Sequence, residues 1–319
     1  MNRSAKEVRP TFRFLRPEVL AKISSLELLA RTVVEGFLAG LHRSPYVGFS
    51  TDFAEYRPYL PGDDLRYLDW KVLARTDRAY IKKFRGDTNT RLYLLVDVSA
   101  SMAYRLPPAI EKREYACYLA ASLAYLATRQ NDAVGLMAFD RAIREYIPAR
   151  WRPGQLHLIL SALERLPSGG TSAIAEALQR IAERVRRRGM LVLLSDLYEP
   201  PETLGPALRR LRSQGQDLIV FHILDESEVT FPFSESARFV DMETGEEVPV
   251  APEAFRASYR EAMRRHLDEI ERLCQAHGID YQQLLTTQPL DWALYAYLGR
   301  RARPRGTPRD LGIAWESHT

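Results

Sequence analysis

Residues 91–102 read Arg-Leu-Tyr-Leu-Leu-Val-Asp-Val-Ser-Ala-Ser-Met, and this stretch decides the fold. Its uncharged run, 92–96, is rich in branched and aromatic side chains, which predicts a strand buried on both faces of a parallel sheet. The strand should end at Asp97, and a loop with two prolines should then lead into a helix over 109–128. Polar groups at the carboxyl end of such a sheet lie where open α/β folds bind ligands.

Strands and helices alternate after this stretch, which predicts an α/β fold: a doubly wound, mostly parallel sheet. A tight turn at 140–141 and a returning strand over 142–147 should add one antiparallel edge strand. A small exposed hairpin is expected around the turn Glu243-Thr244-Gly245-Glu246. The other expected strands are 133–139, 190–195, 217–224 and 279–285, and the other expected helices are 154–165, 172–188, 202–213, 252–277 and 290–301.

The chain divides into four segments. An N-terminal segment, 1–43, carries a helical stripe of apolar residues over 18–41. A signature segment, 44–90, is dense in Pro, Gly, Asp and Arg and predicts ordered loops and short strands packed on the next domain. The α/β domain covers 91–300, with a small hairpin insertion at 229–250. An arginine-rich tail, 301–319, is expected to be flexible.

Oxygen-bearing side chains follow the predicted strands at the same sheet edge. Asp97, Ser99 and Ser101 offer three hard oxygen ligands, the kind that Mg²⁺ prefers, but Mg²⁺ needs six. Thr171, after two glycines, and Asp196, after the strand over 190–195, are the further candidates. Asp and Ser are also common helix caps, which need no metal. The positions of Thr171 and Asp196 favour a site for Mg²⁺ or Mn²⁺ that can also accept an acidic group.

These five residues together resemble the metal-ion-dependent adhesion site of von Willebrand factor A domains. The signature segment is similar to that of a bacterial A-domain family catalogued as domain of unknown function fifty-eight. Its motifs here are Tyr56-Arg57-Pro58-Tyr59, Pro61-Gly62-Asp63-Asp64, Arg66, Asp69-Trp70 and Ala74-Arg75-Thr76. The resemblance covers about residues 40–225. It implies a von Willebrand factor A-like fold and a metal-dependent adaptor for a MoxR-type AAA+ ATPase. It also implies a role in the assembly or activation of client proteins, held through an acidic side chain.

The charged residues of the signature segment form a candidate docking surface for that ATPase. Exposed ion pairs contribute only about 0–1 kcal/mol each, so a dense set of them suggests docking rather than stability alone. Pairing with nearby arginines to hold an irregular segment is the alternative, and the sequence leaves it open. The candidate partner-binding residues are Asp63, Asp64, Arg66 and Asp69.

The sequence contains no recognisable catalytic constellation. A phosphatase of the haloacid-dehalogenase type needs a second carboxylate two residues after Asp97, where Ser99 stands. Gly-x-Ser-x-Gly and His-Glu-x-x-His motifs are absent, and no Gly-Lys-[Ser/Thr] follows the glycines before Thr171. We therefore predict a binding module and not an enzyme. A metal-dependent hydrolase and a chelatase-like accessory subunit are the alternatives.

Composition and charge favour a cytoplasmic protein. Two separated cysteines, Cys117 and Cys274, indicate reduced structural thiols. The longest stretch without charge, 115–128, is shorter than the ~18 residues of a membrane span, so no direct membrane insertion is expected. Residues 1–90 carry 16 Lys plus Arg against 11 Asp plus Glu. Without RNA-binding or helix-turn-helix motifs, this surplus does not favour nucleic acid as a partner.

Overall fold

The computed structural model describes residues 17–23, 25–43, 53–58, 80–84, 90–167, 169–235 and 237–301. The predicted partner-binding residues of the signature segment lie outside these ranges, as does the tail from 302 onward. Within the signature segment the structure describes two paired antiparallel strands, β1 (Phe53–Pro58) and β2 (Tyr80–Phe84).

A six-stranded sheet forms the centre of the protein, in the order β10-β7-β6-β3-β4-β5. Neighbouring strands in it run parallel, except that β4 and β5 are antiparallel. The predicted doubly wound α/β fold with an antiparallel edge strand is thus confirmed. The strands are β3 (Arg91–Asp97), β4 (Ala133–Phe139), β5 (Ile143–Arg150), β6 (Met190–Ser195), β7 (Asp217–Leu224) and β10 (Asp280–Leu285).

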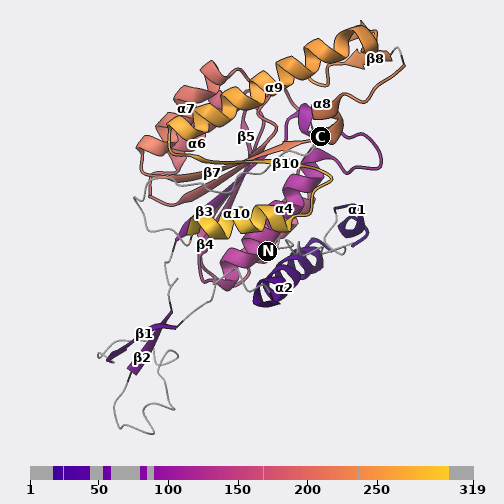
Figure 1. Cartoon of the computed structure of the whole chain (residues 1–319). Helices are drawn as coiled ribbons and strands as arrows, with labels where there is room; N and C mark the ends of the chain where they lie inside the picture. Colours follow the sequence, from indigo (N-terminus) through magenta and orange to yellow (C-terminus); the bar gives the residue numbers. More distant parts are fainter. Residues whose placement is uncertain are drawn as a thin grey trace, which may run out of the picture.

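Helices cover both faces of this sheet (Figure 1). Alternate residues of β3 enter opposite cores, Leu92 and Leu94 on one face and Tyr93 and Leu95 on the other. Because both sides of β3 are buried, its sequence has to be apolar throughout. The first face carries α4 (Lys112–Arg129), α5 (Gln155–Glu164) and α10 (Asp291–Arg301), and the second carries α6 (Ile174–Arg184), α7 (Pro201–Ser213) and α9 (Pro252–Ala276).

An N-terminal layer packs on α4. The prediction of a single N-terminal helix over 18–41 is wrong. The segment forms two separate helices, α1 (Pro17–Leu20) and α2 (Leu26–Arg43). Ser25 explains the break, because its hydroxyl accepts a hydrogen bond from the Leu28 amide at 3.3 Å and caps α2. Phe37 of α2 then lies edge-on against Tyr295 of α10, with ring centroids 4.7 Å apart.

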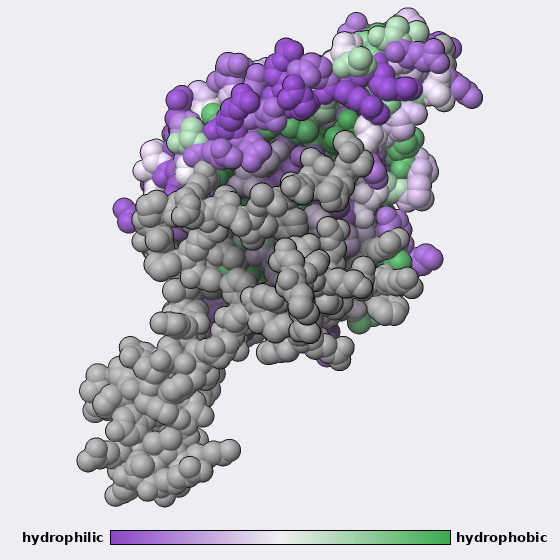
Figure 2. All heavy atoms as spheres, viewed as in Figure 1, coloured by the Kyte–Doolittle hydropathy of each residue, from purple (hydrophilic) through white to green (hydrophobic). Residues whose placement is uncertain are grey.

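The predicted hairpin insertion is present as β8 (Ala237–Val240) and β9 (Glu247–Val250). A short helix that the sequence did not predict, α8 (Glu226–Thr230), leads into it and is held by a capping box between Asp225 and Glu228. In Figure 2 the outer surface of α9 is strongly hydrophilic, and the hairpin end beside it mixes apolar and polar residues. Within the described ranges, no helix has the length and apolar character needed to cross a membrane.

Candidate functional site

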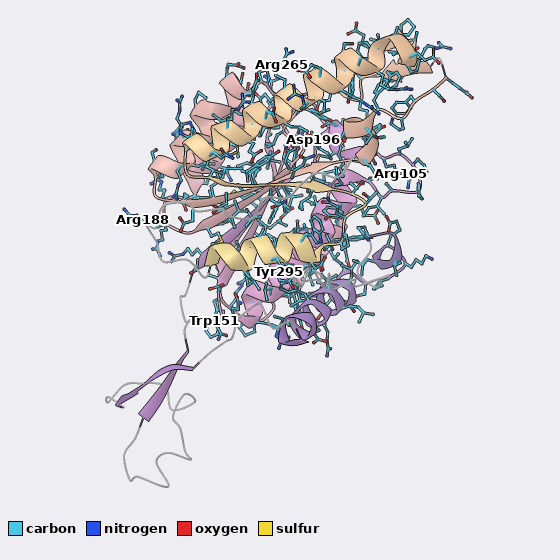
Figure 3. All side chains as sticks on the ribbon, viewed as in Figure 1. Arg105, Trp151, Arg188, Asp196, Arg265 and Tyr295 are labelled. Carbon is cyan, nitrogen blue, oxygen red and sulfur yellow. The ribbon has the colours of Figure 1, made fainter. Side chains whose placement is uncertain are left out.

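The candidate site lies where the strand order reverses, because β4 and β6 flank β3 on opposite sides. Open α/β sheets bind ligands at the carboxyl ends of strands at such a point. Asp97 ends β3, and Asp196 directly follows β6, so parallel pairing of these strands brings the two carboxylates to one edge. Asp196 and Arg188, which stand just after and just before β6 in the sequence, are labelled well apart in Figure 3.

The loop after β3 brings together three of the predicted ligands. The Asp97 side chain is fully buried, and its Oδ1 accepts a hydrogen bond from the Ser99 amide at 2.9 Å. Its Oδ2 accepts one from the Ser195 hydroxyl at 2.6 Å. The hydroxyl oxygens of Ser99 and Ser101 lie 3.1 Å apart at the start of the short 3-10 helix η3 (Ala100–Ala103). Two hydrogen bonds thus fix the orientation of the Asp97 carboxylate.

The loop that carries Thr171 is bound to the Asp97 loop through its backbone. The Ala100 amide donates to the Gly170 carbonyl at 3.0 Å, and the Gly169 amide donates to the Val98 carbonyl at 3.3 Å. Gly170 has φ +141°, and a Cβ there would lie 2.3 Å from Oδ2 of Asp140, so only glycine fits. Thr171 follows directly and is exposed. The structure therefore brings the third predicted loop to the site.

Lys112, the first residue of α4, is a fully buried cation next to Asp196. Its Nζ donates to Asp196 Oδ2 at 2.9 Å and to Glu228 Oε1 at 2.6 Å. It also lies 4.8 Å from the centre of the Tyr198 ring. Burial by itself would lower the pKa of Lys112, but the charges of Asp196 and Glu228 outweigh burial and raise it. The ammonium group therefore stays charged.

Negative charge exceeds positive charge around this ammonium. Asp196 and Glu228 share this one lysine, and the buried Asp97 carboxylate lies close enough to Asp196 for its charge to act on it. Burial, and then the charge of Asp196, raise the pKa of Asp97 to about 7. Oδ1 of Asp196 is buried and has no hydrogen-bond partner among the residues that the structure describes. Buried carboxylate oxygens normally have a partner, so this oxygen is available to a cation.

The residues present fit a hard divalent cation that uses mixed ligands. In the described part of the chain, no three Asp, Glu, His or Cys side chains form a metal-binding group by themselves. A cation here would therefore need serine and threonine hydroxyls beside the two aspartates. Such an all-oxygen set suits Mg²⁺ and Mn²⁺ better than Zn²⁺, which prefers nitrogen and sulfur.

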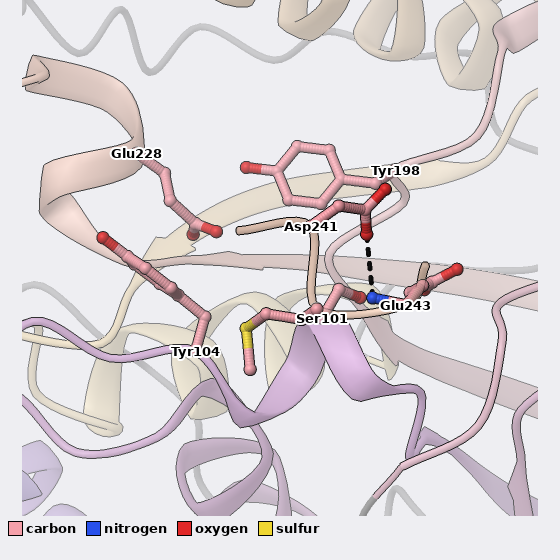
Figure 4. A pocket seen from close by; sticks show the side chains of 7 residues that line it. Ser101, Tyr104, Tyr198, Glu228, Asp241 and Glu243 are labelled. Atoms are coloured by element: carbon pink, nitrogen blue, oxygen red, sulfur yellow. Dashed lines mark hydrogen bonds between the residues drawn. The ribbon is translucent and has the colours of Figure 1, made fainter. Parts of the chain in front are cut away.

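A pocket of about 300 Å³ opens beside this edge of the sheet (Figure 4). Ser101 contributes to its lining, so the pocket adjoins the Asp97 loop. The tip of the β8–β9 hairpin contributes three further residues, two of which are acidic. The lining residues are Ser101, Tyr104, Tyr198, Glu228, Asp241, Met242 and Glu243.

His222 of β7 supports the backbone of Asp196. Its Nε2 lies 2.7 Å from the Asp196 carbonyl oxygen, and its Nδ1 lies 2.8 Å from the Tyr281 hydroxyl. Because a carbonyl oxygen can only accept, Nε2 carries the proton and Nδ1 accepts from Tyr281. Burial lowers the pKa of His222 to about 3, so the imidazole is neutral.

Comparison with known proteins gives the family of the chain. The family model described as "Protein of unknown function DUF58" matches residues 55–269. The chain belongs to this family. Uncharacterized proteins of Mycobacterium bovis and Mycobacterium tuberculosis are each 28% identical over 281 residues, covering 86% of this chain and 87% of theirs. The family expected from the signature segment is thus confirmed for this DUF58 protein.

Solved structures similar to this DUF58 chain include von Willebrand factor A proteins. BatB from Bacteroides thetaiotaomicron is 17% identical, with a TM-score of 0.42, and the match covers 67% of this chain and 98% of BatB. The SpRpn10 VWA domain is 14% identical, with a TM-score of 0.38, over 64% of this chain and 93% of that domain. A von Willebrand factor type A protein from Catenulispora acidiphila is 15% identical, with a TM-score of 0.32, over 58% and 44% of the two chains.

Several residues of the site, His222 among them, were not predicted. Ser195 is the last residue of an otherwise apolar strand and belongs to no recognisable motif. Lys112 opens the sequence Lys-Arg-Glu, which is typical of the exposed first turn of a helix. Glu228 and Glu243 come from segments without a recognisable motif, and only the folded chain brings them to the pocket.

Replacement of Lys112 by Met should destabilise the protein by about 3–5 kcal/mol, because it leaves the buried Asp196 and Glu228 carboxylates without their cation. Urea denaturation at pH 7 measures this change. Arg113→Met is the matched control, since Arg113 pairs with Glu111 at a partly exposed position and its loss should cost about 0–1 kcal/mol. Equal stability of the two variants would show that Lys112 does not neutralise a buried charge.

Acidification should destabilise the protein through His222. The unfolded chain binds a proton at this residue below pH ~6.5, whereas the folded protein binds it only near pH 3. Stability is therefore lost as pH falls through this interval, by about 2–3 kcal/mol between pH 7 and pH 4.5. His222→Gln keeps a donor for the Asp196 carbonyl and cannot titrate, so denaturation curves at both pH values should show a smaller loss. An identical loss in this variant would exclude His222 as the cause.

Proposed function

We propose that the protein is a metal-dependent protein-binding module that holds an acidic side chain of a partner. The observation that carries this proposal is the unpartnered, buried Oδ1 of Asp196 beside the Asp97 loop, in a site with too little positive charge. The neighbouring pocket supplies space for a partner's side chain. A divalent cation would balance the carboxylates and would retain affinity for one more anion.

The proposed ligands are Asp97, Ser99, Ser101, Thr171 and Asp196, and the proposed cation is Mg²⁺ or Mn²⁺. When bound, this ion supplies an electrophilic contact for a carboxylate oxygen. The other residues of the site orient these ligands. Ser195 holds the Asp97 carboxylate, Lys112 holds only Oδ2 of Asp196, and His222 holds the Asp196 carbonyl.

We propose binding and not catalysis. The buried histidine of the site uses both ring nitrogens in hydrogen bonds and is neutral, so it is not available as a general base. The two carboxylates proposed as ligands would be committed to the cation. Phosphatase and esterase assays with Mg²⁺ or Mn²⁺ should show no turnover, and turnover would favour the metal-dependent hydrolase.

The proposed partners are a MoxR-type AAA+ ATPase and a client protein that offers an acidic side chain. The support for the ATPase as a partner is the resemblance of the signature segment, 44–90, to the family. A chelatase-like accessory subunit would use the same docking surface of the signature segment. We propose that this function is cytoplasmic. Cys117 and Cys274 are both buried and form no disulfide, as expected for a reducing compartment.

Metal-free protein should bind one Mn²⁺ or Mg²⁺ per chain in a calorimetric titration, and Asp97→Asn should abolish this binding because it removes a charged ligand. Ser195→Ala should weaken binding by about 10–100-fold, as loss of a ligand's supporting hydrogen bond does. Asp268→Ala, in a surface ion pair on α9, is the control and should bind as the wild type does. Equal affinity of wild type and Asp97→Asn would rule out the proposed site.

Association with a purified MoxR-type AAA+ ATPase should depend on the same carboxylate. Wild type and Asp97→Asn should be compared at one Mg²⁺ concentration, because the ATPase itself requires the ion. In biolayer interferometry we expect Asp97→Asn to bind the ATPase at least tenfold more weakly than wild type does. This corresponds to a loss of about 1.4 kcal/mol in binding free energy. Unchanged association would move the ATPase surface away from the metal and towards the signature segment.

A further inference from the structure

We propose that Glu243 is an internal ligand of the candidate metal site, taking the place that a partner's acidic side chain would occupy. The inference rests on the proposed function, because it requires the cation. Nothing in the sequence marks Glu243, which lies in a four-residue turn more than forty residues after Asp196 in the chain. The proposal comes from where the β8–β9 hairpin places this residue.

The tip of the hairpin is a compact, internally bonded turn. Oδ1 of Asp241 accepts hydrogen bonds from the Glu243 amide at 2.8 Å and from the Thr244 amide at 3.3 Å. The Gly245 amide donates to the Asp241 carbonyl at 2.8 Å, and Gly245 has φ +74°, which suits glycine. Figure 4 shows the bond from Asp241 to the Glu243 amide. The turn therefore holds the backbone of Glu243 in one conformation.

The Glu243 carboxylate bridges from the hairpin to the predicted metal loops. Its Oε2 accepts a hydrogen bond at 2.9 Å from the amide of Ser172, which directly follows Thr171. It also lines the same pocket as Ser101. Within residues 240–249, all of which the structure describes, Glu243 alone is partly buried. The side chain thus turns inward while its neighbours face solvent.

This placement adds negative charge where it is already in excess. Burial raises the pKa of Glu243, and the charge of Asp196 raises it further, while the Ser172 amide acts in the opposite direction. Asp196 and Glu228 already share one lysine, and the Asp97 carboxylate lies close enough to Asp196 for its charge to act on it. Carboxylates brought together in this way repel one another unless a cation lies among them. Asp97, Asp196 and Glu243 do not form a metal-binding group in the described structure, so a divalent ion would have to draw the Glu243 side chain inward to complete the ligand set from within the chain.

A helix cap is the simpler explanation of the same hydrogen bond. Ser172 lies just before α6, and a carboxylate is favoured at a helix N-terminus. However, Glu199 already accepts from the Ala175 amide in the first turn of α6 at 2.9 Å. A cap also does not require that Glu243 share a pocket with Ser101. The two explanations differ in whether the negative charge of Glu243 matters, and this difference can be measured.

If Glu243 is an internal ligand, it competes with a partner's carboxylate for the same position on the cation. A partner's carboxylate would have to displace Glu243, and the hairpin tip would then leave the pocket. Val240, Met242 and Val248 are all about half exposed on this hairpin, at 53%, 45% and 50%. Their apolar side chains would move with the tip, so displacement of Glu243 would change the surface that the protein presents next to the metal.

The test uses Mn²⁺ as the metal and acetate as the carboxylate probe, with the full-length chain. Glu243→Gln keeps an oxygen that can accept from the Ser172 amide, and so retains the cap, but it removes the negative charge. Glu246→Gln makes the same change at an exposed position of the same hairpin and is the matched control. Asp241→Ala breaks the hydrogen bonds of the turn and is a second route to the same effect.

We expect Glu243→Gln to bind Mn²⁺ about tenfold more weakly than wild type does, because one charged ligand is lost. Water-proton relaxation by the bound Mn²⁺ should rise, since water takes the vacated position. Acetate should then lower this relaxation at a smaller concentration than in wild type. Asp241→Ala should change relaxation in the same direction, whereas Glu246→Gln should match wild type.

Three outcomes would overturn the inference, and they separate it from the proposed function. If wild type binds Mn²⁺ but Glu243→Gln and Glu246→Gln show the same affinity and relaxation, Glu243 is only a helix cap and the metal site stands. If Glu243→Gln loses affinity without a rise in relaxation, Glu243 acts at a distance and is not a ligand. If wild type does not bind Mn²⁺, the metal site and the internal ligand both fail.

Discussion

The parallel pairing of β3 with β6 is the constraint on which the candidate site depends. Residues 92–96 pair in register with residues 190–194, so the next polar residues of the two strands emerge at one edge. The sheet is covered on both faces, and this edge is therefore where polar groups can gather without interrupting a core. Four further elements reach this edge. They are the Asp97 loop, the Thr171 loop, the first turn of α4 and the β8–β9 hairpin.

Charge balance is the second organising principle of the molecule. A buried lysine between two carboxylates is stable only as a set, since each charge would be costly to bury alone. The set joins three parts of the chain that are far apart in sequence: the start of α4, the end of β6 and the short helix α8. Lys112 therefore does two things. It fixes α8, from which the hairpin departs, and it leaves one oxygen of Asp196 unengaged. The same ion pair thus positions both the proposed metal ligand and the hairpin that reaches it.

The fold was largely predictable because its signals are local. An uninterrupted apolar run such as 92–96 indicates a strand that is buried on both faces of a sheet. The ends of β3, β4, β6 and β7 were predicted to within about a residue. Failures occurred where tertiary packing decides the outcome. The apolar stripe over 18–41 continues across Ser25 and gave no sign of the break there. The predicted helix over 172–188 was too long at its end, since α6 ends at Arg184 and the next arginines lie outside the helix. The site was predictable only as far as strand ends define it. Asp97 and Asp196 could be found from the strands they follow. Lys112 and Glu243 could not be found in this way. Both stand in charged stretches typical of exposed segments, and only the assembled fold buries Lys112 and partly buries Glu243.

The contact between Gly170 and Asp140 links two parts of the protein that perform different tasks. Asp140 accepts hydrogen bonds from the Ala142 amide at 2.8 Å and from Arg144 at 2.6 Å, and so shapes the turn into the edge strand β5. The same carboxylate occupies the space that a side chain at residue 170 would need. A smaller residue at 140 would remove this clash and loosen the sheet edge, but it would not relieve the φ of +141° at residue 170. Glycine at 170 is therefore required by its own backbone as well as by its neighbour. A glycine that stays invariant at 170, even where position 140 changes, is the mark that this geometry should leave in an alignment of the family.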